Sequence, residues 1–332
     1  MRCLLMEFCV QTYYKKEDLP PIEDVNFFHY ASSFNWNENI SYYKPLMLVV
    51  FEDEKPVAAM FALTMRINRF LYGSFFKRCY ISQQPSFFEE YLPQIEIFDL
   101  LMKGLVKEVG GKVFFIEYRN ISSAIFGYKG FRDNGFYSVK WISIKNSLQR
   151  KRTIWNQMSV MRKNQINKAR RKGIAIEELT SAEKLPEIYK LVEEAKNWKI
   201  TRRFPPYQYF ENFYKYYILE GKGKILITRY HDKIIGGIIL GFEQEKVYCL
   251  YYWGKDKTYQ TIHPSVFTIY SAMEMAEENG YQSFDFMDAG FLNKRTGRPR
   301  FLLQFGGKQQ ASRRWYRINW QWLNFFANKI YD

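Results

Sequence analysis

A chain of 332 residues is long enough to bury a large hydrophobic core and to form two domains. Apolar residues make up 47% and aromatic residues 19% of it, which excludes an intrinsically disordered protein. The formal net charge of +15 comes from two stretches without Asp or Glu: residues 134–176 hold eleven Lys or Arg, and residues 289–331 hold nine. Such stretches attract the phosphates of a nucleotide, a tRNA, an anionic lipid or a phosphorylated sugar, or they only keep the surface soluble.

The first half of the chain alternates strand patterns with one helical pattern. Apolar, β-branched runs predict strands at residues 45–52, 57–65, 78–82, 112–118 and 136–144. The first two runs flank a short polar turn and predict a hairpin. A helix is predicted from Pro93 to Val109, because its apolar residues recur at helical spacing and Gly110-Gly111 follows.

The second half repeats this order. Strands predicted at residues 224–229 and 234–242 form a second hairpin, and its turn lysine, Lys233, lies 178 residues after Lys55. The helix-ending glycines Gly110 and Gly280 lie 170 residues apart, and a short apolar strand follows each. A constant offset of about half the chain predicts two copies of one domain, residues 1–150 and 151–332.

A basic segment, residues 158–173, opens the second copy and predicts a helix that ends at Gly173. Val160, Asn164 and Arg171 fall on one face of it, so this stripe is not strongly apolar. The segment is either a solvated surface helix or part of a phosphate-binding patch.

Residues 247–290 hold the clearest pattern of the chain. An aromatic strand, residues 247–254, leads through a polar loop into a helix that begins at Pro264, and a second short strand follows at residues 284–287. Two neighbouring parallel strands need a crossover of this kind. The free N–H groups at the start of such a helix suit a phosphate or pyrophosphate.

The sequences FDFMDAG, at residues 284–290, and RPRFLLQFGG, at residues 298–307, are more specific. They resemble the signature of the Fem-type aminoacyl and peptidyl transferases and their acyltransferase relatives, which carry two GNAT domains in one chain. The resemblance implies a mixed α/β fold with tandem GNAT-like domains and a central cleft. The chain departs from the pattern in two places: Leu302 replaces the signature lysine, and the loop before Pro264 lacks the Gly-rich motif of CoA-binding enzymes.

The resemblance also implies where the substrates bind. The donor, an acyl-CoA or an aminoacyl-tRNA, is expected along the aromatic strand and at the start of the following helix. The donor-binding candidates are Trp253, Gly254, Lys255, Lys257, Thr261, His263 and Ser265. The acceptor-binding candidates are Arg298, Arg300, Phe301 and Phe305, although packing explains the two phenylalanines equally well.

Acyl transfer of this type needs a base for the attacking amine and an acid for the leaving group. Asp288 and Asp285 are the first candidates for the base, because they lie near the end of a strand beside the expected cleft, and Glu117 of the first half is the third. Tyr252 is the candidate acid. Capping, ion pairing or packing is the alternative explanation for each of these side chains.

We therefore predict an N-acyltransferase that moves an acyl group from a thioester donor to an amine, on a sugar or a cell-envelope precursor. The alternatives are a transferase that uses aminoacyl-tRNA, and a binder of RNA or another anionic polymer without activity. No pattern of Cys, His and acidic residues predicts a metal site. No segment reads as a signal peptide or a membrane span, which predicts a cytoplasmic protein with, at most, peripheral contact to a membrane.

Overall fold

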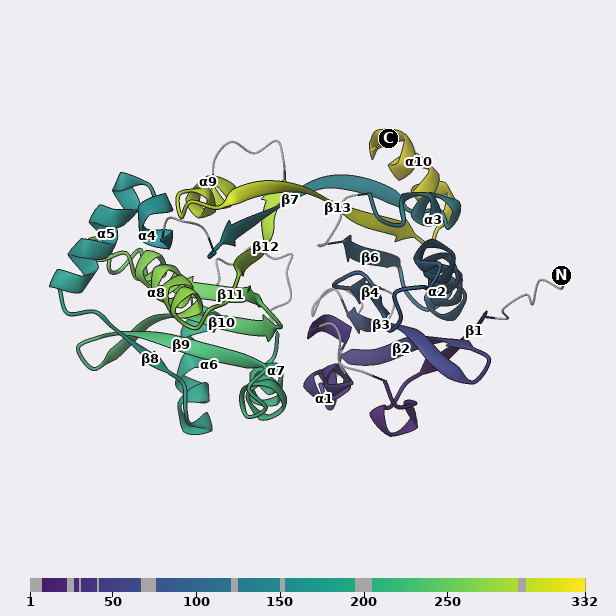
Figure 1. Ribbon diagram of the computed structural model, residues 1–332, viewed down its shortest axis with the longest axis horizontal. Coiled ribbons are helices and arrows are strands. Elements are labelled where there is room, and N and C mark those ends of the chain that lie inside the picture. The colour runs from purple at the N-terminus through teal and green to yellow at the C-terminus, as the bar shows by residue number, and fades with distance from the viewer. Residues whose placement is uncertain are drawn as a thin grey trace. The chain divides into compact units, whose positions relative to one another are not determined.

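The computed structural model describes residues 8–22, 27–29, 31–40, 42–66, 76–120, 125–149, 153–194, 205–291 and 297–331. Contacts divide these residues into two units: unit 1 holds those up to residue 140 and from residue 312 on, and unit 2 holds residues 141–311. Both units combine a mixed sheet with helices, so the predicted α/β class is confirmed (Figure 1). The domain limits of 1–150 and 151–332 and the central cleft stay predictions.

The sheet of unit 1 has the strand order β1-β2-β3-β4-β6-β13. Its strands are β1 (Phe8–Tyr13), β2 (Tyr43–Glu52), β3 (Lys55–Arg66), β4 (Lys77–Ile81), β6 (Phe115–Asn120) and β13 (Lys308–Ile318), and the short β5 (Ser86–Phe87) pairs with β3. β4 and β6 are parallel, and the other neighbours are antiparallel. The predicted hairpin of the first half is therefore confirmed as β2 and β3.

The helices of unit 1 are α1 (Ser32–Asn37), α2 (Gln94–Val109), α3 (Tyr128–Asp133) and α10 (Gln321–Tyr331), with 3-10 turns at Lys16–Asp18 and Phe27–His29. The crossover from β4 to β6 runs through α2, which begins after Pro93 and ends at Gly110, as predicted. Its apolar side chains, among them Phe98 and Leu101, pack with Trp315 of β13 in one buried cluster. This cluster lies on one face of the sheet, because strand residues alternate between faces.

Unit 2 has the same topology, with the strand order β8-β9-β10-β11-β12-β7 when it is given in the same direction as that of unit 1. Its strands are β7 (Tyr137–Ser147), β8 (Ala175–Glu178), β9 (Gly223–Tyr230), β10 (Lys233–Glu243), β11 (Lys246–Gly254) and β12 (Ser283–Phe291). Its helices are α4 (Ile154–Gln157), α5 (Val160–Arg171), α6 (Leu185–Glu194), α7 (Tyr207–Phe213), α8 (Pro264–Glu278) and α9 (Arg298–Leu303), with a 3-10 turn at Ala182–Lys184 and a π-helical turn at Tyr214–Ile218. β11 and β12 are parallel and α8 joins them, as the sequence predicts.

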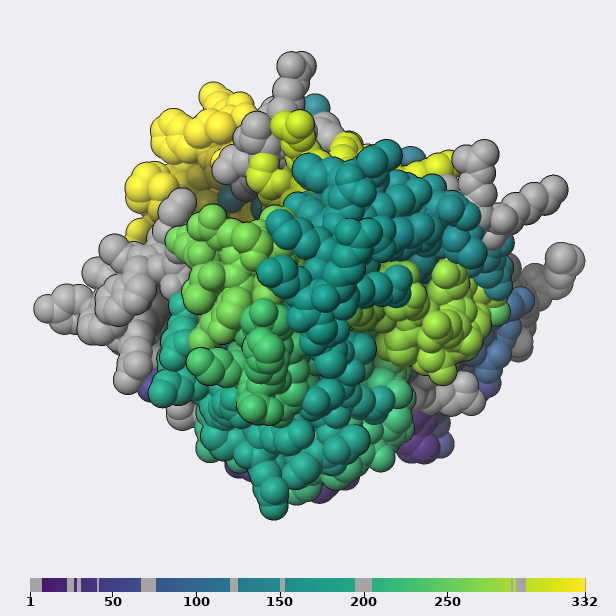
Figure 2. Space-filling view, turned by 90° about the vertical axis from the view of Figure 1, so that its left-hand side faces the viewer, coloured from purple at the N-terminus to yellow at the C-terminus, as the bar shows by residue number. Residues whose placement is uncertain are grey.

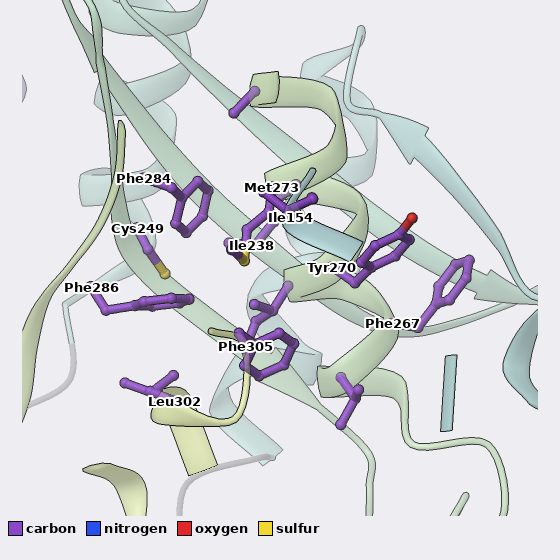
Figure 3. Close-up of a cluster of buried hydrophobic side chains, with 14 of the residues drawn as sticks. Ile154, Ile238, Cys249, Phe267, Tyr270, Met273, Phe284, Phe286, Leu302 and Phe305 are labelled. Atoms are coloured by element: carbon purple, nitrogen blue, oxygen red, sulfur yellow. The ribbon is translucent and has the colours of Figure 1, made fainter. Parts of the chain in front are cut away.

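The core of unit 2 lies between this sheet and α8. Ile269, Tyr270 and Met273 of α8 are fully buried against strand residues such as Cys249 and Phe284 (Figure 3). Pro264 stands at the first position of α8, where the missing N–H is not needed. The apolar face of the helix therefore fixes where its N-terminus lies relative to β11.

The last strand of each sheet is exchanged between the two halves of the chain. β7 follows β6 in sequence but pairs antiparallel with β12 in unit 2, whereas β13 follows β12 and pairs antiparallel with β6 in unit 1. Apart from the short β5, each unit thus has six described strands in the same spatial order, and one of them comes from the other half of the sequence. This exchange is the part of the repeat that the sequence did not reveal.

Candidate active site

The two parallel strands of unit 2 separate partway along their length. Their ladder pairs Lys246–Tyr248 with Ser283–Asp285 and ends there in the described structure, although β11 runs on to Gly254 and β12 to Phe291. β11 also changes register against β10 between Ile239 and Leu240, which is the signature of a β-bulge. Beyond Tyr248, β11 stays paired with β10 on one side, and on its other side the described ladder with β12 has ended, which leaves a gap between β11 and β12.

Asp285 lies at the last paired position before this gap. Its neighbours Phe284 and Phe286 point into the core beside α8 (Figure 3), so the alternation of strand residues places Asp285 on the opposite face of the sheet. The side chain is buried, and among the described residues its Oδ1 has no hydrogen-bond partner. Burial raises the pKa of Asp285 to about 6, although Lys145 and Lys246 oppose that rise. A carboxylate in this state is ionised at neutral pH and ready to accept a proton.

Asp288 and Tyr252 are the other candidates from the two strands that border the gap. Asp288 belongs to β12 by its backbone, but its side chain lies outside the described structure. Tyr252 of β11 stacks on Phe301, with ring centroids 6.1 Å apart, and the guanidinium of Arg298 lies 5.6 Å from its ring centre. Burial raises the pKa of Tyr252, which keeps its hydroxyl protonated and able to donate.

Glu117 of unit 1 lies within a buried network of ion pairs. Its carboxylate accepts hydrogen bonds from Arg78 (2.9 Å), Arg119 (3.0 Å) and Arg314 (3.2 Å), and from the hydroxyl of Tyr316 (3.4 Å). Burial favours the neutral form, but the arginines outweigh it and lower the pKa of Glu117. A carboxylate held in its ionised form by three arginines is a weak base, so these surroundings favour Asp285 over Glu117 as the proposed base.

The start of α8, where a phosphate was expected, is already occupied by a side chain. Asp256 accepts a hydrogen bond from the backbone N–H of Ser265 (3.1 Å) and another from the Ser265 hydroxyl. Gly254 passes so close to this turn that a Cβ there would lie 2.7 Å from the Ser265 nitrogen, which explains the glycine. Since a carboxylate caps the helix, a pyrophosphate at this place would have to displace it.

The remaining donor-loop candidates do not converge on one point. Lys255 forms an ion pair with Glu194 (3.2 Å), and Trp253 is buried against Gly237. Lys257 and Thr261 are exposed. His263 has a positive φ of 46° directly before α8, and burial lowers the pKa of its imidazole.

A buried arginine of α5 was missed by the sequence reasoning. Arg162 is 4% exposed, and no carboxylate of the described residues lies within ion-pair distance of it. The central carbon of its guanidinium lies 4.2 Å from the ring centre of Phe301 and 5.2 Å from that of Phe305. One guanidinium nitrogen also donates a hydrogen bond to the Phe301 carbonyl oxygen, at 3.2 Å. Its Nε has no partner in the described structure, and burial lowers the pKa of Arg162 to about 10.

A hydrogen bond connects Arg162 to Gln165, which lines a hollow in the surface. Arg162 donates to Gln165 (2.6 Å), whose amide nitrogen lies 3.4 Å from Nε2 of His263. Beside this chain of contacts opens a hollow of about 430 Å³, lined by Val160, Met161, Asn164, Gln165, Lys168 and His263. Figure 2 views this side of unit 2 and shows the teal segment that contains α5 at the surface. A cation, two amides and an imidazole around one hollow suit a polar or anionic ligand.

Some residues of the signature segment, 298–307, are buried and others are exposed. Leu302 and Phe305 are fully buried in the core of unit 2 (Figure 3), so the place of the family lysine is an apolar one here. A Cβ at Gly306, whose φ is +88°, would lie 2.5 Å from the Gln157 carbonyl oxygen, so this turn requires glycine. Arg298 and Arg300 are exposed on α9 and remain accessible to a substrate.

Residues 159–295 match the model of a family described as acetyltransferase (GNAT) domain. This part of the chain is therefore similar in sequence to a GNAT domain. It contains α5, α8, the β11–β12 gap and Asp285, so the match covers the whole candidate site apart from α9. It supports the predicted class of enzyme, an acyltransferase of the GNAT type. No curated protein matches the chain in sequence.

The fold of the whole chain resembles several solved structures. FemX has a TM-score of 0.64 at 12% identity, with 91% of this chain and 94% of FemX covered. A tandem GNAT protein from the clavulanic acid biosynthesis pathway has a TM-score of 0.55 at 8% identity, with 94% and 99% covered. The L-PGS structure from Bacillus licheniformis has a TM-score of 0.53 at 14% identity, with 81% and 86% covered. These similarities confirm the predicted fold of tandem GNAT-like domains.

The described residues contain neither a cluster placed to bind a metal ion nor a helix that could span a membrane. No group of three or more His, Cys, Asp or Glu among them is placed to hold a metal ion. No helix within the same ranges is both long enough and apolar enough to cross a membrane.

Proposed function

We propose that the protein transfers an acyl group from an activated donor to an amine at the gap between β11 and β12. The observation that carries this proposal is the end of the β11–β12 ladder at Asp285, a buried carboxylate with a raised pKa. The amine nitrogen attacks the carbonyl carbon of the donor while its proton passes to Asp285. Unpaired N–H groups of β11 stabilise the oxyanion, and the bond to the leaving sulfur or oxygen then breaks. Tyr252 supplies the proton that the leaving group takes up.

Asp256 favours an aminoacyl-tRNA over an acyl-CoA as the donor. The pyrophosphate of CoA would meet this carboxylate at the start of α8, where Ser265 has no free N–H to offer. An RNA backbone has another surface available, because Lys168, Arg171 and Lys172 are exposed along α5. The hollow beside His263 would then take the terminal nucleotide of the donor.

The acceptor that we propose is an amino group on a sugar or a cell-envelope precursor. The resemblance of residues 284–290 and 298–307 to the signature of the Fem-type transferases supports this class. An amine acceptor also fits Asp285, since a base with this pKa removes a proton from the attacking nitrogen as the new bond forms.

The test supplies both donors in parallel to the full chain. Acetyl-CoA is followed by release of free thiol, and tRNA charged with labelled amino acids is followed by movement of label to amino sugars or envelope precursors. Label transfer from tRNA without thiol release supports the proposal, and thiol release alone assigns the donor to CoA. Binding of tRNA without transfer to any amine contradicts a transferase and favours an RNA-binding protein.

A charge variant with a matched control makes the donor test sharper. Replacing Lys168, Arg171 and Lys172 with Gln should weaken tRNA binding at least about tenfold and reduce its salt dependence. Replacing three exposed lysines elsewhere in the same unit, Lys190, Lys215 and Lys233, with Gln removes the same charge and should have a much smaller effect. Equal losses in both proteins would indicate non-specific attraction by the net charge.

A further inference from the structure

The helix α10 carries its apolar stripe on the outside of unit 1. Trp322, Phe325, Phe326 and Ile330 recur at helical spacing and are 61%, 56%, 58% and 75% exposed, and none of the helix residues is buried. Trp320, directly before the helix, extends this face and packs edge-on against Phe114 at 5.2 Å. A surface helix of a globular protein normally turns such a stripe toward the core, so α10 has the reverse orientation.

Directional hydrogen bonds hold α10 in this orientation. Asn324 accepts from the backbone N–H of Ile318 (2.9 Å) and donates to the carbonyl of Gly135 (2.8 Å). One turn later, Asn328 accepts from Arg132 (3.1 Å) at the end of α3. The helix lies beside α3 (Figure 1) and docks onto unit 1 through its asparagines. It cannot turn its aromatic rings inward without breaking these hydrogen bonds.

The segment of the chain that carries the stripe has charge of one sign. The sequence holds no Asp or Glu between residues 289 and 331. Lys329 stands within the stripe, with its ammonium 4.6 Å from the ring centre of Phe325. Aromatic rings accompanied by a lysine are the residues that settle at the boundary between lipid head groups and acyl chains, where the rings enter the apolar layer and the ammonium stays with the phosphates.

We propose that this face of α10, formed by Trp320, Trp322, Phe325, Phe326, Lys329 and Ile330, docks unit 1 onto an anionic lipid surface. The rings and Ile330 would lie in the interfacial layer, and Lys329 would pair with lipid phosphates. A protein partner with an apolar groove would leave Lys329 to be desolvated or paired with an acid, whereas a lipid surface accommodates both parts of the stripe. The proposal does not depend on the transferase activity, since it concerns binding alone.

Co-sedimentation of the full chain with vesicles tests the proposal, with tryptophan fluorescence as a second readout. Vesicles of phosphatidylcholine alone are compared with vesicles of equal parts phosphatidylcholine and phosphatidylglycerol. We expect binding to the mixed vesicles with a blue shift of the emission, and much weaker binding to the neutral ones. Phe325→Ser with Phe326→Ser should weaken binding at least about tenfold. Lys329→Glu should weaken it about tenfold on the mixed vesicles and much less on the neutral ones.

Leu219→Ser is the matched control, because Leu219 is a large apolar residue of unit 2 with 67% exposure. It should bind vesicles as the unchanged protein does, and all variants should keep the same melting temperature since the replaced side chains are exposed. The proposal fails if the unchanged protein does not bind the mixed vesicles, or if the double serine variant binds them as strongly as the unchanged protein does. It also fails if that variant only converts a dimer to a monomer, which would assign the face to a second copy of the chain.

Discussion

The two units carry a carboxylate at the same place in the same sheet. Glu117 is the third residue of β6, where it faces Tyr80 on the parallel strand and Tyr316 on the antiparallel one. Asp285 is the third residue of β12, where it faces Tyr248 and Lys145 in the corresponding registers. The repeat of the fold therefore supplies two equivalent buried acids, and the surroundings decide what each one does.

The surroundings differ in charge and in strand pairing. Three arginines bind Glu117 and lower its pKa, whereas burial raises the pKa of Asp285 to about 6 against only two lysines. The β4–β6 ladder covers β4 up to its last residue, Ile81, whereas β11 continues beyond its ladder with β12. Unit 1 thus uses the position as an ionic anchor, and unit 2 leaves it at the edge of a gap.

The largest effect on stability is expected at the anchor. Glu117→Gln leaves three guanidinium groups around a neutral amide, and loss of one partner of a buried ion pair costs about 3–5 kcal/mol. The free energy of unfolding, measured in urea at neutral pH, should fall by that amount. Because the pKa of Glu117 is lowered in the folded state, its contribution is present above the unfolded pKa and disappears as the pH falls. A variant as stable as the unchanged protein would mean that the arginines do not depend on Glu117.

The largest effect on activity is expected at the gap. Asp285→Asn should lower turnover by about 10²-fold, the usual scale for a general base, without a loss of stability at neutral pH. Asp288→Asn is its control: if that variant loses more activity than Asp285→Asn, the base is Asp288. The unchanged protein should gain turnover as the pH rises through about 6, and the Asn variant should lack this limb.

The expected contribution of Asp285 to stability has the opposite pH dependence to that of Glu117, because its pKa is raised and not lowered. A carboxyl with a raised pKa stabilises the fold while it is protonated, below the unfolded pKa near 4, and this contribution is lost as the pH rises through about 6. Melting temperatures of Asp285→Asn and the unchanged protein should therefore diverge across this window, with the variant the more stable at neutral pH. Parallel curves would show that Asp285 does not titrate there.

Local patterns in the sequence were sufficient to predict most of the elements. Apolar and β-branched runs predicted both hairpins, and Pro264 with Gly280 bounded α8. The exchange of β7 and β13 was not predictable, because the choice of a strand's partner depends on long-range packing that the local pattern does not contain. The signature segment pointed to the candidate site that we propose, although Leu302 proved to be part of the core.

The polar contacts of the site were harder to predict. Arg162 shares a buried face of α5 with Ile166 and Ala169, whereas the sequence reasoning followed Val160, which is exposed. The spacing of Arg162 from Ile166 and Ala169 was the signal that could have identified it. Asp256 gave no such signal, because a loop brings it to a helix start nine residues later, outside the spacing of ordinary caps.

A smaller effect is expected at the starts of the two crossover helices. Asp256→Ala removes the cap of α8 and should cost about 1 kcal/mol of unfolding free energy. The freed N–H of Ser265 should then bind pyrophosphate more tightly than in the unchanged protein, as measured by titration calorimetry. α2 has no side-chain cap, so Gln94→Ala at its start is the control and should change neither quantity. Unchanged pyrophosphate affinity in Asp256→Ala would contradict our reason for favouring tRNA over CoA.

The smallest effect concerns the residues that face the two carboxylates across the antiparallel ladder. Lys145 lowers the pKa of Asp285, so Lys145→Gln should move the acidic limb of turnover to higher pH by less than about one pH unit and leave the plateau unchanged. Tyr316 has the corresponding position beside Glu117 in unit 1, and Tyr316→Phe should not move the limb at all. Because Lys145 acts on the rate only through the charge of Asp285, a limb that stays in place would show that another group controls the reaction. A shift caused by both variants would instead mean that the two carboxylates are coupled, and that the anchor of unit 1 also takes part in function.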